Sequence, residues 1–313
     1  MDVVQVERFG GPEVLRAATV ADPSPGAGEA VIEVTASDVM FLDTLLRAGW
    51  GEDFFPVRPP YVPGSGVVGL VDGRRVVADT KQDVGGSEIP VGGYTSRAVV
   101  AESELIPVPA ALTDQQAVAL LHDGPTLQSL LSDVGAPRRV LVAAAAGGAG
   151  VLLVQELAAR GVHVVAAARG EAKTSLLRSL GVAEVVDYGS SSWTSRVAPV
   201  DTVLDGAGGA LGRAAFELVA DGGRFVSYGT AGGEFAAPDP AVAARRGVTV
   251  GGLTDLPRLT RARRRALVER SPAEAAEGRY RPVIGQTFPL ARAAQAHAAI
   301  AAREAVGKTL LVP

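Results

Sequence analysis

The chain of 313 residues contains no cysteine and only three histidines. Without cysteine it forms no disulfide, has no thiolate nucleophile and cannot bind zinc through sulfur. The three histidines (His122, His163 and His297) lie far apart in the sequence, and none has a partner at the spacing of a metal-binding pair. We therefore expect no metal centre. His163 lies in a predicted strand and is expected to be structural. His297 is expected on the exposed face of a C-terminal helix.

Long apolar runs and dense basic clusters are also missing. No apolar stretch approaches the ~20 residues of a membrane span, and the first residues lack a signal-peptide layout, so we predict a cytoplasmic protein. The net charge is −4, and the densest basic run, Arg261–Arg265, is expected to be a solvated helix face. Membrane and nucleic-acid binding are thus disfavoured. With 47% hydrophobic residues the chain can bury a large core, and a small-molecule substrate is the expected partner.

The pattern of elements changes along the chain. Residues 1–110 hold short β-branched segments separated by glycine, proline and aspartate, which is typical of a β domain. Beyond them, strands alternate with helices, which favours an α/β fold with a parallel, doubly wound sheet. The expected strands are Val140–Ala144, Val162–Ala167, Glu184–Asp187, Thr202–Asp205, Arg224–Tyr228 and Val248–Gly251, and the helices are Val151–Arg160, Glu171–Leu180 and Leu211–Ala220.

Two other segments complete this outline. Residues 113–134 are expected to be helical, with a break at Gly124-Pro125. A last strand, Thr309–Val312, has no room for a crossover helix before it, so we expect it to return to the first domain. The predicted domains are residues 1–112 together with 256–313, and residues 113–255.

The most informative motif lies within residues 140–155. An apolar run ends in a glycine-rich turn, and an apolar helical segment follows at once, as in a dinucleotide-binding unit. Gly147 would let the backbone approach a pyrophosphate, and Gly150 would let the helix pack closely on the strand. Backbone N–H groups at the helix start would then face the phosphates. The residues assigned to this cofactor turn are Ala145, Gly147, Gly148, Ala149 and Gly150.

The end of the second strand of this domain indicates which dinucleotide is bound. A fold that selects NAD places Asp or Glu there, about 20 residues after the turn. Ala168 holds that position here, Arg169 follows it, and Lys173 lies one helical turn beyond. Without the acid, a 2′-phosphate is not repelled, and the two cations can pair with it. The pattern favours NADPH; ordinary surface charges are the alternative interpretation of these cations.

Other strand ends should also meet the cofactor, because ligands of open parallel sheets bind beyond the carboxyl ends of the strands. Gly206, after the fourth strand, is expected to pass under the cofactor. Tyr228 and Gly229, at the end of the fifth, are expected to flank it. Asp205 is interpreted as a turn-capping acid, with catalysis as the alternative.

In its order of elements and its motifs, the chain resembles the zinc-independent quinone oxidoreductase branch of the medium-chain dehydrogenase/reductase superfamily. The resemblance covers nearly the whole chain, and its most specific piece is Ala144–Val151 followed by Leu153–Gln155. The other matching segments are Val39–Gly49, Pro63-Gly64, Gly92–Tyr94, Glu171–Lys173, Leu180-Gly181, Val186–Tyr188, Asp205, Gly222–Arg224 and Gly307-Lys308.

This resemblance implies a GroES-like β domain, a Rossmann domain, an active cleft between them, NADPH as cofactor and a homodimer. The implied chemistry is hydride transfer from C4 of the nicotinamide to a quinone or to the β-carbon of an enone, without zinc. The resemblance also implies cofactor contacts from Tyr188, Leu253 and Lys308.

Departures from the family pattern fall in or near the expected substrate cleft. Met40 stands where the family has Asn, Gly66 where an acidic residue often follows Pro-Gly, and Trp50 near the place of a frequent Tyr. The loop after Val71 is shorter than usual. We expect a broad apolar cleft that suits a flat aromatic substrate. Its predicted lining includes Met40, Phe41, Trp50 and Leu253.

Few side chains are candidates for the chemistry. A quinone reduced by hydride gives an anion that can take its proton from solvent, whereas an enolate needs a donor more urgently. Asp43 matches a family aspartate, with a turn cap as the alternative. Thr126 aligns with a family threonine near the nicotinamide, with a helix N-cap as the alternative. His122 is interpreted as a donor to a substrate carbonyl or as a structural residue.

Three functions stay open at this point. The first is an NADPH-dependent reductase of quinones or α,β-unsaturated carbonyls, aromatic natural-product intermediates among them. The second is an NADPH-binding protein without reductase activity that serves as a structural or regulatory partner, an alternative that the Met40 departure keeps open. The third is cyclisation or dehydration without net redox change.

Overall fold

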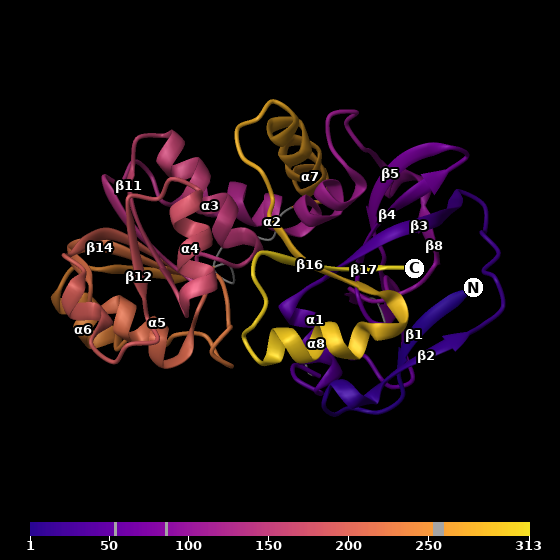
Figure 1. Ribbon diagram of the computed structural model, residues 1–313, viewed down its shortest axis with the longest axis horizontal. Coiled ribbons are helices and arrows are strands. Elements are labelled where there is room, and N and C mark those ends of the chain that lie inside the picture. The colour runs from indigo at the N-terminus through magenta and orange to yellow at the C-terminus, as the bar shows by residue number, and fades with distance from the viewer. Residues whose placement is uncertain (53–54, 85–86, 253–259) are drawn as a thin grey trace. The chain divides into compact units, whose positions relative to one another are not determined.

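The computed structural model describes residues 1–52, 55–84, 87–252 and 260–313 (Figure 1). The chain divides into two compact units, and two of the four crossings between them fall within a helix, one in α2 (Asp114–Asp133) and one in α7 (Arg261–Ala276). The domain boundaries predicted from the sequence stay predictions. Unit 1 comprises Met1–His122, Val268–Ala276 and Pro282–Pro313, and unit 2 comprises Asp123–Leu267 and Glu277–Arg281.

Unit 1 is the predicted β domain. Its main sheet has the strand order β16-β17-β3-β4-β5-β9, and β8 also pairs with β3. The elements of this unit are β1 (Asp2–Val6), β2 (Leu15–Thr19), β3 (Glu29–Val39), α1 (Phe41–Arg47), β4 (Gly66–Val71), β5 (Arg74–Asp79), β6 (Gln82–Val84), β7 (Ser87–Ile89), β8 (Arg97–Ala101), β9 (Ile106–Pro107), β16 (Ile284–Pro289), α8 (Ala293–Ala301) and β17 (Lys308–Val312).

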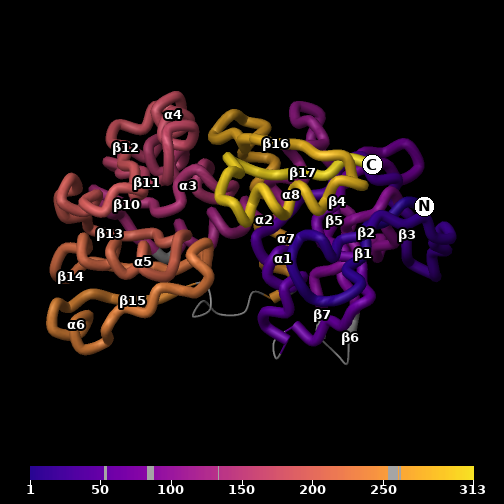
Figure 2. Tube along the Cα trace, turned by 60° about the horizontal axis from the view of Figure 1, so that its bottom comes forward, coloured from indigo at the N-terminus to yellow at the C-terminus, as the bar shows by residue number. Residues whose placement is uncertain are grey.

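The C-terminal segment returns to unit 1, as predicted. Strand β17 pairs antiparallel with β3, with Thr309 opposite Val39, and parallel with β16, which the sequence analysis missed. Helix α8 lies along β16 and β17 (Figures 1 and 2). The exposed position expected for His297 is wrong, because His297 is fully buried. It shares the buried face of α8 with Ala293 and Ala296, whose small side chains let the helix lie close to its neighbours.

Unit 2 is a doubly wound Rossmann domain, which confirms the predicted α/β fold class. Its strands run in the order β12-β11-β10-β13-β14-β15, and every pair is parallel. The elements are β10 (Arg139–Ala143), α3 (Gly148–Ala159), β11 (His163–Ala168), α4 (Glu171–Ser179), β12 (Glu184–Asp187), β13 (Val200–Asp205), α5 (Gly209–Phe216), β14 (Val219–Ser227), α6 (Pro240–Arg245) and β15 (Thr249–Gly252).

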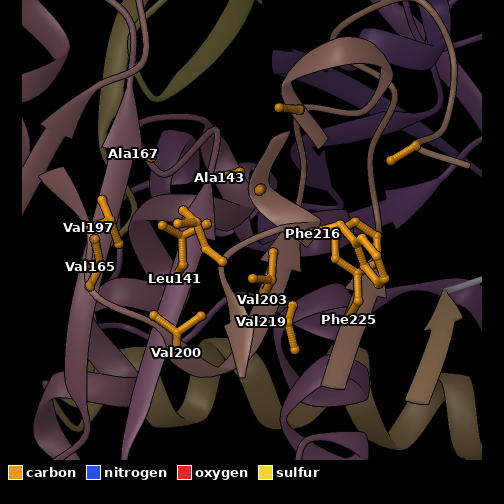
Figure 3. Packing of buried hydrophobic residues seen from close by; sticks show 14 of the residues in the cluster. Leu141, Ala143, Val165, Ala167, Val197, Val200, Val203, Phe216, Val219 and Phe225 are labelled. Atoms are coloured by element: carbon orange, nitrogen blue, oxygen red, sulfur yellow. The ribbon is translucent and has the colours of Figure 1, made fainter. Parts of the chain in front are cut away.

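The core of unit 2 explains why its strands are apolar throughout. A parallel sheet is covered by helices on both faces, so both sides of each strand are buried. Figure 3 shows side chains of β10, β11 and β13 packed together, with Phe216 of α5 against Phe225 of β14. The two rings meet edge to face, with centroids 5.7 Å apart, a favourable aromatic geometry.

Several expected helix bounds differ from the structure, and α3 begins at Gly148, three residues before the predicted Val151. Helix α5 ends at Phe216, before the predicted Ala220, because Val219 already pairs with Val200 as the start of β14. Helix α2 continues through Pro125, so the predicted break is wrong. A proline inside a helix costs about 3 kcal/mol. Two fully buried leucines on the next turn, Leu127 and Leu130, contribute about 1.5–3 kcal/mol each and offset that cost.

Candidate functional site

The glycine-rich turn of unit 2 connects β10 to α3. Ala144 has a left-handed φ of 57°, and the N–H of Gly147 donates to the Ala144 carbonyl at 3.0 Å, which closes the turn. A Cβ on Gly150 would lie 2.6 Å from the carbonyl oxygens of Ala144 and Ala145. Only glycine therefore lets α3 start this close to the strand end.

The start of α3 has the form of an anion site. The first N–H groups of a helix have no acceptor within the helix, and its N-terminus carries partial positive charge. A Cβ on Gly147, the residue before α3, would meet only the Ala144 oxygen, at 3.4 Å, which leaves room for a phosphate. A Cβ on Gly148 would overlap the Asp123 carboxylate, so that carboxylate lies against the helix start and a side chain at position 148 would displace it. Gly148 and Ala149 thus present bare backbone at the helix start.

The strand ends beside this turn are held by Asp205 and Tyr228. Asp205 Oδ1 accepts the N–H groups of Ala207 and Gly208, both at 3.0 Å, so Asp205 caps its turn as expected. Burial raises the pKa of Asp205. The Tyr228 hydroxyl donates to the Ala143 carbonyl at 3.3 Å, and its ring covers Gly206, where a Cβ would overlap the phenol.

The end of β11 brings together three of the residues assigned to the 2′-phosphate. The Tyr188 N–H donates to the Ala168 carbonyl at 3.1 Å, so Tyr188 lies directly beside Arg169 at the strand end. Arg169 is exposed, and Lys173 is on the first turn of α4. Ala168 is buried and offers no carboxylate. Arg169 and Lys173 give this corner two cations that can bind a phosphate group, next to the carboxylates of Asp187, which pairs with Ala168, and Glu171, which begins α4.

Unit 1 contains a buried charge cluster formed by Asp38, Asp79, His122 and Lys308. Both ring nitrogens of His122 face carboxylates: Nδ1 lies 2.9 Å from Asp38 and Nε2 lies 2.7 Å from Asp79. Lys308 Nζ lies 2.8 Å from the same Asp38 oxygen. Lys308, predicted as a cofactor contact, is therefore a counterion of Asp38 in this structure.

The charges of this cluster stabilise one another. Burial raises the pKa of Asp38, but Lys308 and His122 outweigh it and hold that pKa well below its usual range. Burial lowers the pKa of His122, but Asp38 and Asp79 outweigh it and raise the pKa to about 10. His122 is thus a cation at neutral pH that lies between the two carboxylates, with the Ser65 hydroxyl also 3.3 Å from Nε2. This geometry favours its structural interpretation over that of a proton donor to substrate.

Sequence reasoning missed Asp38 and Asp79. The Asp38 carboxylate occupies the space beside Gly66, where a Cβ would overlap it and lie 3.0 Å from the His122 ring. The loss of the expected acid at position 66 and the carboxylate at position 38 are therefore sterically linked. Asp38 lies in the fully buried last four residues of β3, where a carboxylate needs a buried partner.

The other catalytic candidates have structural roles or positions. Asp43 Oδ2 accepts the N–H of Met40 at 2.8 Å, which caps the start of α1. Burial and then the charge of Asp38 raise the pKa of Asp43 to about 7. Thr126 lies inside the unbroken α2, so its alternative role as a helix N-cap is wrong.

The predicted substrate contacts lie around α1. Met40 and Phe41 are at its start, and the Arg303 guanidinium lies over the Phe41 ring, 5.2 Å from its centroid. Trp50 follows the helix and is 40% exposed. Leu253, predicted to contact both cofactor and substrate, lies outside the described residues.

The described residues contain neither a metal-binding group nor a membrane-spanning helix. Within them, no three His, Asp or Glu side chains come together as a metal-binding group. No helix in the same ranges is long and apolar enough to cross a bilayer.

Comparisons with known proteins agree across the chain. Residues 180–311 match the family model described as "zinc-binding dehydrogenase". A quinone oxidoreductase of Pseudomonas aeruginosa is 29% identical over 99% of both chains, and a probable quinone oxidoreductase of Schizosaccharomyces pombe is 31% identical over 99% of this chain and 96% of its own. The quinone oxidoreductase of Thermus thermophilus, whose structures include an NADPH complex, is 32% identical with a TM-score of 0.84 over 100% of both chains.

Proposed function

The chain belongs to the quinone oxidoreductase branch of the medium-chain dehydrogenase/reductase superfamily, and we propose that it transfers a hydride from NADPH to a quinone. The observation that carries the proposal is the end of β11, where Ala168 stands in place of the NAD-selecting acid and Arg169 follows it, beside the glycine turn of unit 2. Unit 2 would hold the pyrophosphate at Gly147–Gly150 and the 2′-phosphate at Arg169, Lys173 and Tyr188. NADPH, when bound, supplies the hydride.

The protein's part in this reaction is positioning. Gly206, Tyr228 and Gly229 form the floor beside the turn, and Tyr228 is fixed by its bond to the Ala143 carbonyl. Holding two reactants in the right geometry supplies much of the rate enhancement of such a step. A quinone leaves as a hydroquinone anion that solvent can protonate. Both ring nitrogens of His122 already contact carboxylates, which favours a quinone over an enone, because an enone needs a side-chain proton donor.

We propose that the reaction needs no zinc, although the matching family model names zinc-binding dehydrogenases. The chain has no cysteine, and the ring nitrogens of His122 are directed at Asp38 and Asp79. Charge on the reduced substrate would be stabilised by the cofactor and by solvent rather than by a Lewis acid.

A homodimer is proposed for unit 2. Strand β15 is the last strand in the sheet order, and Val250 on it is 44% exposed, so another strand can pair with this edge. Light scattering during size-exclusion chromatography measures the mass directly, and a monomer at micromolar concentration contradicts this part. The cytoplasmic location expected from the sequence stays a prediction.

Anaerobic stopped-flow spectroscopy with a panel of quinones and enones tests the function. We expect rapid NADPH oxidation with quinones and much slower oxidation of NADH. Arg169→Ala should weaken NADPH binding about ten-fold or more and leave NADH binding nearly unchanged. Arg178→Ala, which removes the same charge at the other end of α4, is the matched control.

The same experiment separates the alternatives. Tight NADPH binding without oxidation by any acceptor indicates the structural or regulatory protein. Conversion of a substrate without NADPH indicates a cyclase or dehydratase. Equal affinity for NADPH and NADH contradicts the cofactor assignment.

A further inference from the structure

Unit 1 also contains a buried series of hydrogen-bonded side chains, here called the hydrogen-bond relay, which has no role in the function proposed above. It runs through Asp43 of α1, Tyr94 and His297 of α8, side chains that are 1% exposed or less. The Tyr94 hydroxyl lies 3.1 Å from Asp43 Oδ2 and 2.8 Å from His297 Nε2. These residues are 51 and 203 positions apart in sequence, so only the fold brings them together.

The number of protons available gives the hydrogen-bond relay a direction. A carboxylate only accepts, so the single proton of the Tyr94 hydroxyl goes to Asp43. The Tyr94 oxygen must then accept from His297 Nε2–H. Burial, and then the charge of Arg47, lower the pKa of His297 to about 3, so the ring is neutral and holds this one tautomer. In the hydrogen-bond relay, His297 Nε2–H therefore donates to the Tyr94 hydroxyl, which donates to the Asp43 carboxylate.

The hydrogen-bond relay ends at the backbone N–H of Met40. The same Asp43 oxygen that accepts from Tyr94 also accepts the Met40 N–H at 2.8 Å. Helix α1 has only seven residues, and a helix this short is not stable by itself. The place where it begins is consequently set by contacts such as this one. Met40 and Phe41, the proposed substrate contacts, lie at that point.

We propose that Tyr94 and His297 are positioning residues that orient the Asp43 carboxylate and so fix the substrate-facing start of α1. The effect of these two residues on catalysis rests on the function proposed above. Tyr94 and His297 touch neither substrate nor cofactor in this proposal; they act through Asp43.

The geometry also couples the start of α1 to pH. Asp43 Oδ1 has no hydrogen-bond partner among the described residues, so it can take a proton without displacing Met40 or Tyr94. A neutral acceptor makes weaker bonds than a carboxylate, so protonation loosens both contacts. The charged or titratable side chains that act on Asp43 are Asp38, His122 and Tyr94. Tyr61 also interacts with Asp43, and Arg47 of α1 interacts with Tyr61. Burial raises the pKa of Asp43 to about 7, which places the transition near neutrality.

The kinetic test compares two tyrosines. Tyr94→Phe removes one oxygen and both of its hydrogen bonds, and we expect KM for the quinone to rise about ten-fold with kcat and NADPH affinity little changed. Tyr61→Phe is the matched control, since the buried Tyr61 hydroxyl has no hydrogen-bond partner in the part of the chain that the structure describes. His297→Gln, which keeps an N–H donor, should stay near native, whereas His297→Leu should resemble Tyr94→Phe. Equal KM in the two tyrosine variants overturns the proposal.

A second readout does not depend on activity. The backbone N–H of Trp50 donates to the Leu45 carbonyl at 3.0 Å, which ties Trp50 to the C-terminal end of α1, so its emission reports on that helix. In a Trp193→Phe background we expect that emission to titrate near pH 7, at higher pH in Tyr94→Phe, and not at all in Asp43→Asn. A titrating signal in a protein that reduces no quinone supports the hydrogen-bond relay and contradicts the proposed function. An active enzyme whose Trp50 emission does not titrate contradicts the proposed role of the relay and leaves the proposed function intact.

Discussion

Replacing Lys308 with methionine tests the charge cluster of unit 1. Lys308 is 5% exposed and its ammonium lies 2.8 Å from the fully buried Asp38. Removing one partner of a buried ion pair costs about 3–5 kcal/mol, because the other charge stays buried. His122 remains as a second counterion, so we expect the lower end, about 3 kcal/mol. The stem of methionine keeps most of the packing.

The pH dependence of this variant has a definite sign. In the native protein the pKa of Asp38 lies below its unfolded value, so its stabilisation is present above the unfolded pKa of 3.8 and is lost as the pH falls. Without Lys308 that pKa rises, and acid unfolding should begin at higher pH. The pKa of His122 is raised from 6.5 to about 10, so its stabilisation is present below pH 6.5 and disappears as the pH rises toward 10.

Urea denaturation of a double-mutant cycle measures the coupling. Lys308→Met and Asp38→Asn should each be strongly destabilising, and the double variant should lose much less than their sum. Lys81→Met is the control, because Lys81 pairs with Glu88 at the surface and should cost no more than about 1 kcal/mol. Native stability of Lys308→Met together with a large loss of NADPH affinity refutes the reasoning. Lys308 would then be the nucleotide contact that the family resemblance implies.

Three further predictions concern the site. Gly150→Val should abolish NADPH binding measured by fluorescence, because its Cβ would lie 2.6 Å from two carbonyl oxygens; native affinity contradicts the turn geometry. Quinone reductase activity should survive exhaustive chelation, and a loss that zinc restores overturns the zinc-free proposal. His122→Asn should change kcat for a quinone only a few-fold while lowering stability, since the ring balances two carboxylates. A hundred-fold fall in kcat would make His122 the proton donor.

Sequence patterns predicted the Rossmann unit well, because its signals are local. Alternating apolar strands and helices are written in consecutive residues, and β12 begins and ends where the pattern places it. The glycine turn needs small residues at adjacent positions for steric reasons that hold in any such unit. The absence of an acid at position 168 can likewise be recognised from the sequence, because the end of the second strand lies at a known distance after the glycine turn.

The charge cluster and the hydrogen-bond relay were decided by tertiary structure alone. Asp38, Asp79, His122 and Lys308 come from β3, β5, α2 and β17, and their charges are tolerable only because the fold places them within hydrogen-bond distance. His297 illustrates the same limit. A histidine among alanines on a terminal helix is typical of a surface, and no local pattern shows that Tyr94, far away in sequence, provides the partner that lets it be buried.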